Sequence, residues 1–188
     1  MNKRTGTFIL TALSLAGLGT AGCERKPQQR ASDASKSTDG LAPVLPENLF
    51  VQEAPAGARD VTDVKADKSA TAEVVVHGRI GGRKEPFVDG AAMFMLADVN
   101  MRPCNELHGD RCPTPWDYCC EPRESLVAKV ATIQVIGADG RPLRINLKGK
   151  HGLEPLAELT VAGEVAQRDE HGTLVINARE IHVNTNRG

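Results

Sequence analysis

Aromatic side chains and net charge are both scarce in this chain. Its 188 residues include one Trp, one Tyr and four Phe, and 23 Lys and Arg nearly balance 24 Asp and Glu. Binding nucleic acid through bulk electrostatics needs an excess of positive charge, and gripping single strands also needs exposed aromatic platforms. The composition therefore makes nucleic acid an unlikely partner.

Short motifs of common active sites are missing as well. The sequence contains no Gly-x-Ser-x-Gly, no His-Glu-x-x-His and no phosphate-binding loop. Its five histidines are scattered along the chain. A binding role is therefore favoured over catalysis, and no catalytic residue is assigned.

Residues 1–22 have the pattern of a secretory signal peptide. Lys3 and Arg4 precede a run of small and apolar residues that is too short and too glycine-rich for a typical membrane span. The run ends in Thr20-Ala21-Gly22-Cys23, which resembles a bacterial lipobox. The resemblance implies cleavage before Cys23 and acylation of its thiol, with palmitate or a similar chain. We therefore expect an extracytoplasmic protein of the cell envelope that is held to the membrane by lipid. The alternative is an ordinary cleaved signal that leaves Cys23 as an odd thiol.

The composition of residues 23–70 predicts a flexible tether. Ser, Ala, Gln, Pro, Lys and Asp dominate, and apolar periodicity is weak. Leu45–Val51 is the only apolar patch, and it could dock as a short strand or turn. The compact domain is accordingly predicted to span residues 71–184.

Strand-like alternation of apolar residues recurs through this domain. It predicts strands over 74–80, 91–97, 126–136, 143–147, 159–165 and 174–183, with a hairpin turn at Asp139-Gly140 and no long amphipathic helix. Gly78 and Gly163 each lie inside a Val-x-Gly-x-aliphatic strand, where glycine often marks the corner of a small barrel. The layout resembles the OB-fold. The predicted class is all-β, a small OB-fold-like barrel, with a generic β-sandwich as the alternative.

A cysteine-rich segment, residues 99–125, interrupts the predicted domain between its second and third strands. It contains the other four cysteines, together with Trp116 and Tyr118. The string Cys-Pro-Thr-Pro-Trp-Asp-Tyr-Cys-Cys, residues 112–120, resembles one in uncharacterised bacterial lipoproteins with an OB-like domain. The resemblance supports the architecture and implies no activity. Four acidic residues of the segment are expected to form a solvated surface, and they are Glu106, Asp110, Asp117 and Glu121.

Disulfides are the first interpretation of Cys104, Cys112, Cys119 and Cys120. An even number of cysteines in an exported protein favours disulfide bonds. A bond between the adjacent Cys119 and Cys120 would close a strained ring. Cys104 and Cys112 are then each expected to pair with one of those two, which would staple the loop.

Metal binding and thiol redox chemistry are the alternatives. The same four cysteines could hold zinc as thiolates, although their spacing lacks a Cys-x-x-Cys knuckle. Copper is a second possibility, with Met93 and Met95 on one face of a strand and His108 further along. This arrangement resembles exported OB-fold copper carriers, and it fails if the methionines face the core. The third alternative is thiol redox chemistry, with Cys119 and Cys120 as a reactive dithiol.

These observations favour a membrane-anchored extracytoplasmic binding module. Its ligand would be an unknown protein or small molecule at the barrel mouth, and no cofactor is required. The alternatives are a domain that binds or carries copper or zinc, and a thiol redox protein.

Overall fold

The computed structural model describes residues 42–69, 72–109 and 111–184. The predicted signal peptide and the predicted lipidation site, Cys23, lie outside these residues. None of the helices in the described part is long and apolar enough to cross a membrane. The elements in chain order are β1 (Arg59–Asp60), α1 (Val61–Ala66), β2 (Glu73–Ile80), β3 (Met93–Ala97), the 3₁₀ helices η1 (Cys104–Glu106) and η2 (Pro115–Asp117), α2 (Arg123–Lys129), β4 (Val130–Gln134), the 3₁₀ helix η3 (Lys150–Gly152), β5 (Glu158–Arg168) and β6 (Leu174–Val183).

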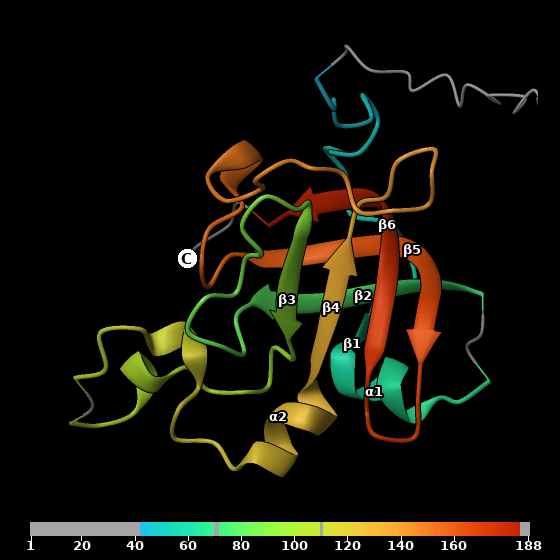
Figure 1. The fold of residues 1–188 in the computed structure, drawn as a ribbon. Helices are drawn as coiled ribbons and strands as arrows, with labels where there is room; N and C mark the ends of the chain where they lie inside the picture. Colours follow the sequence, from blue (N-terminus) through green and yellow to red (C-terminus); the bar gives the residue numbers. More distant parts are fainter. Residues whose placement is uncertain (1–41, 70–71, 110, 185–188) are drawn as a thin grey trace, which may run out of the picture. The chain divides into compact units, whose positions relative to one another are not determined.

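Five of the strands close into a barrel. Their order is β2-β3-β4-β6-β5, and the pairing of β2 with β5 completes the ring. All neighbours are antiparallel except β4 and β6, which run parallel (Figure 1). The short β1 adds to β2 in parallel. The all-β, OB-fold-like prediction is confirmed.

The barrel interior follows from the alternation of the strands. In β2 the side chains of Val74, Val76 and Ile80 are buried, while the intervening residues are exposed or half-buried. Phe94 and Leu96 of β3 point into the same core. Because alternate strand residues face opposite sides, each strand contributes one apolar row to the interior.

The two mid-strand glycines lie where strands approach closely. A Cβ on Gly78 would lie 2.5 Å from Cγ of Leu96, and a Cβ on Gly163 would lie 2.2 Å from the carbonyl oxygen of Asn177. The register of β5 against β6 shifts between Ala162 and Gly163. Both positions therefore require glycine. The sequence had singled out the same two glycines as corners of a small barrel.

Two strand predictions are wrong in part. The predicted strand over 126–136 begins only at Val130, because Arg123–Lys129 form α2 after Pro122, whose carbonyl accepts from the amide of Leu126 at 3.2 Å. The predicted return strand over 143–147 is reduced to an isolated bridge between Ile136 and Pro142. Proline has no N–H to donate, which limits pairing after the turn.

The predicted boundary of the tether at residue 70 is also wrong. Leu49, Val61 and Val64 are fully buried in the barrel core. Phe50 bridges to Ile181 of β6, and α1 follows β1 directly. Three widely spaced apolar side chains thus fix a segment of otherwise polar composition, and the folded unit starts before Leu49.

Truncating Leu49 should test this boundary. Leu49→Ala is expected to lower the free energy of unfolding by about 2–5 kcal/mol, the cost of deleting a fully buried leucine side chain. Val44→Ala is the control, because Val44 is 74% exposed, and a change within about 0.5 kcal/mol is expected. Urea denaturation measures both. Equal effects would mean that residue 49 does not pack on the barrel.

Candidate metal centre in the cysteine-rich segment

Sulfur atoms from all four described cysteines gather in the segment between β3 and α2. The Sγ of Cys119 lies 3.7 Å from the Sγ of Cys104 and 3.7 Å from that of Cys112. The Sγ of Cys120 lies 3.9 Å from that of Cys104. No S–S bond joins any of the four in the described structure, so the disulfide pairing stays a prediction.

Asp117 joins three of these sulfurs. One ligand atom each from Cys104, Cys112, Asp117 and Cys119 lies within 4.8 Å of every other. The carboxylate oxygen Oδ1 of Asp117 is 3.9 Å from the Sγ of Cys112. Three thiols and a carboxylate at this spacing could hold a metal ion.

The backbone around η2 brings these groups together. The carboxylate of Asp117 accepts from the Thr114 hydroxyl at 2.8 Å and from the Cys119 amide at 2.9 Å. Tyr118 adopts a left-handed conformation with φ of 54°, which reverses the chain between Asp117 and Cys119. The turn directs Cys119 back toward Cys104 and Cys112. Asp117 is only partly exposed, and its carboxylate is engaged within the turn rather than free on a solvated surface.

Charge within the cluster is distributed unevenly. Partial burial opposes ionisation of Asp117, but hydrogen bonds from Thr114 and the Cys119 amide outweigh it and hold the pKa of Asp117 below its ordinary value. Hydrogen bonds with Cys112 and Cys104 raise the pKa of Cys119 far above that of a free thiol. A nucleophilic thiolate needs the opposite shift, which weakens the redox alternative.

The segment is held to the barrel at the end of β2. The amide of Gly82 donates to the carbonyl of Trp116 at 2.8 Å, and Tyr118 is fully buried. Arg79 of β2 pairs with Glu158 at 2.7 Å and lies 3.7 Å from Glu106 of η1. The cysteine cluster is thus mounted on the barrel wall.

Gly81 permits this docking. A Cβ at this position would lie 2.6 Å from the carbonyl oxygen of Trp116 and 2.9 Å from the Tyr118 ring. Gly81→Ala is expected to displace the segment and shift the emission of the chain's single Trp to longer wavelength, as the indole meets more water. Fluorescence spectroscopy measures the shift. Gly57→Ala is the control, because nothing lies within 4 Å of its added Cβ; an unshifted Gly81→Ala spectrum would contradict this docking.

The predicted copper ligands are placed differently. Phe94 and Leu96 are buried, so Met93 and Met95 lie on the outer side of β3, as that prediction required. The sulfur of Met95 accepts a hydrogen bond from Thr132 of β4 at 3.6 Å. His108 is exposed and does not belong to the cysteine–aspartate group. The structure therefore gathers the cysteines with Asp117, a residue that the sequence spacing did not indicate.

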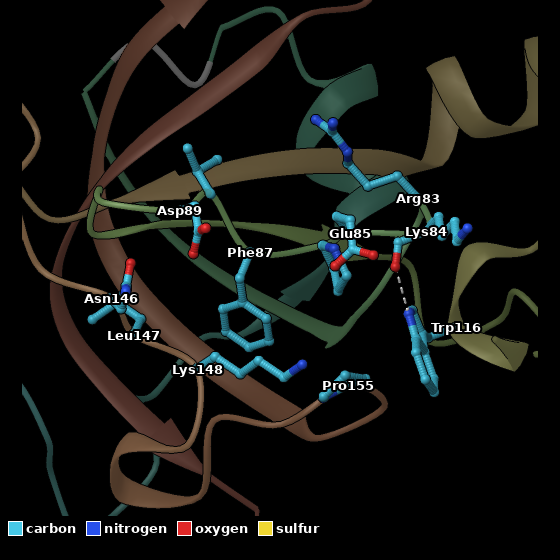
Figure 2. Close-up of a pocket in the computed structure, with 12 residues that line it drawn as sticks. Arg83, Lys84, Glu85, Phe87, Asp89, Trp116, Asn146, Leu147, Lys148 and Pro155 are labelled. Carbon is cyan, nitrogen blue, oxygen red and sulfur yellow. Dashed lines mark hydrogen bonds between the residues drawn. The ribbon is translucent and has the colours of Figure 1, made fainter.

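A cleft of about 650 Å³ opens beside the segment. Phe87 lies at its centre and Lys148 extends toward Pro155 (Figure 2). Trp116 forms one wall, where its indole N–H donates to the carbonyl of Lys84 at 3.0 Å. Both positive and negative side chains line this cleft, so it identifies no ligand class, and the predicted binding role stays a prediction.

Barrel and cluster together define a small closed β-barrel with a cysteine- and aspartate-lined site on an inserted segment. Comparison with protein-family models, with curated proteins and with solved structures found no match. The resemblance to lipoproteins with a similar cysteine string therefore stays a prediction.

Proposed function

We propose that this chain is a lipid-anchored, extracytoplasmic metal-binding module. Its site holds one zinc-like divalent cation through the thiolates of Cys104, Cys112 and Cys119 and the carboxylate of Asp117. The observation that carries the proposal is the spacing of the sulfurs. Thiolates placed tetrahedrally around zinc at about 2.3 Å are about 3.8 Å apart. The two distances from Cys119 are both 3.7 Å.

The ligand set favours zinc over copper. Copper(I) prefers soft sulfur ligands, whereas zinc accepts thiolate, imidazole and carboxylate together. Asp117 supplies a charged oxygen beside the thiols, and the exposed His108 lies outside the group. A divalent cation also offsets the repulsion that would arise among several thiolates and a carboxylate.

Native mass spectrometry tests the proposal. The chain should be exported into an oxidising compartment by its own signal segment and recovered from the membrane fraction. One bound zinc per chain is expected, and after the metal is removed in acid the chain should have the mass of its fully reduced form, because thiolate ligands give up protons to bind zinc but form no S–S bonds. A metal-free chain lighter by the hydrogens of two disulfides would overturn metal binding and make the segment a covalent staple. Recovery only in soluble form would overturn the anchor alone.

A further inference from the structure

The segment between β4 and β5 carries concentrated positive charge. Residues 141–151 include four Lys and Arg and no Asp or Glu, in a chain whose net charge is −1. All four cations are exposed, and they are Arg141, Arg144, Lys148 and Lys150. Asp139 and Glu154 flank the segment. The net charge of this segment is therefore positive, whereas that of the whole chain is slightly negative.

This segment lies where the chain enters the domain. Ile145, Lys150 and His151 line one cavity together with the stretch from Pro43 to Phe50. The ring of Phe50 stacks on that of His151 with centroids 4.0 Å apart. In Figure 1 both segments occupy the upper end of the barrel, whereas α1 and α2 occupy the other end. The residues that follow the proposed anchor thus meet the basic segment directly.

An exposed apolar side chain accompanies these cations. Val44 is 74% exposed, one of two large apolar side chains described as exposed, and it lines the same cavity as Lys150. Pro43 and Pro46 also line that cavity. Glu47 is the acidic residue among its lining residues. Apolar groups rimmed by Lys and Arg are typical of surfaces that rest on a bilayer interface.

We propose that this basic face, defined as Val44, Arg141, Arg144, Lys148 and Lys150, lies against an anionic lipid bilayer. Basic residues near a membrane are attracted to anionic headgroups over a Debye length. The proposal rests on the proposed anchor, because a lipid at Cys23 would keep the domain within reach of the membrane. The cysteine cluster plays no part in it.

Vesicle binding by an anchor-free chain tests this face. Residues 23–188 with Cys23→Ser should sediment with phosphatidylcholine vesicles that contain phosphatidylglycerol, and not with phosphatidylcholine alone. Binding should weaken as salt is raised. Arg144→Gln with Lys150→Gln is expected to weaken binding by about ten-fold.

Lys68→Gln with Arg123→Gln is the matched control. It removes the same charge from exposed positions outside the basic face and should leave most of the binding. Equal losses in both double variants, or no preference for phosphatidylglycerol, would overturn the proposal. Capture on heparin without capture by vesicles would assign the face to an acidic macromolecule and overturn it too. If the acylated chain stays in membranes while the anchor-free chain ignores vesicles, the anchor stands and this inference fails.

Discussion

Cys119→Ser is expected to weaken zinc binding by at least about 100-fold. Loss of an outer contact to a metal ligand already costs 10- to 100-fold, and this change removes a proposed ligand itself. The Sγ of Cys119 lies 3.7 Å from both Cys104 and Cys112, so its loss opens the centre of the cluster. Competition with a chromophoric zinc chelator measures the change in affinity.

Cys120→Ser is the matched control for that experiment. Cys120 is adjacent to Cys119 in sequence and is also exposed, but its sulfur does not belong to the group of four mutually close ligand atoms. Because its Sγ contacts that of the proposed ligand Cys104 at 3.9 Å, its replacement should cost about ten-fold in zinc affinity, the low end for an outer contact and well below the loss expected for Cys119→Ser. If the segment instead held two disulfides, each serine variant would remove one of them. Equal defects in the two variants would therefore contradict the zinc site.

Much of the barrel could be predicted because most of its strands show an apolar pattern that can be recognised from neighbouring residues alone. Val74, Val76 and Ile80 fall on one face of a strand with period two, so both the strand and its buried face follow from the sequence. Gly78 and Gly163 could also be recognised locally, because each interrupts a Val-x-Gly-x-aliphatic strand pattern. Helix α2 was missed because Leu126 begins an apolar run that continues into β4. The docking of Leu49 was anticipated in the apolar patch Leu45–Val51, whereas Val61 and Val64 were missed because they are isolated apolar residues in a polar segment.

The candidate site was only partly predictable, since it depends on contacts across the segment. The cysteines stood out by number, and the sequence favoured disulfides among them, with zinc binding and redox chemistry as alternatives. One local signal for the site was available but was not used. In a turn, an Asp side chain readily accepts a hydrogen bond from the backbone amide two residues later, as Asp117 does from Cys119. Here that turn carries Cys119 toward Cys104. The cleft beside Trp116 is lined by residues that are far apart in the sequence, at 83–89, 116, 146–148 and 155. No local sequence pattern can predict that they come together.

Gly163→Ala should cause a large loss of stability in the barrel. The added Cβ would lie 2.2 Å from the carbonyl oxygen of Asn177 and 2.9 Å from Cγ2 of Ile176. Gly163 also pairs with Val74 of β2, so β5 is held on both sides and cannot shift away. We expect the free energy of unfolding to fall by about 3 kcal/mol, at the upper end for overpacked cores. Urea denaturation in the presence of a chelator measures this without any contribution from bound metal.

Gly90→Ala separates steric overlap from the general cost of replacing glycine. Gly90 has φ of +70°, and nothing lies within 4 Å of an added Cβ. Only backbone strain of about 1–2 kcal/mol is therefore expected. A loss in Gly163→Ala no larger than in Gly90→Ala would show that β5 and β6 are not so closely packed. Because Gly163 lies in the barrel and the zinc ligands lie on the inserted segment, the folded fraction of Gly163→Ala should keep its zinc affinity, whereas Cys119→Ser should lose affinity and keep the barrel.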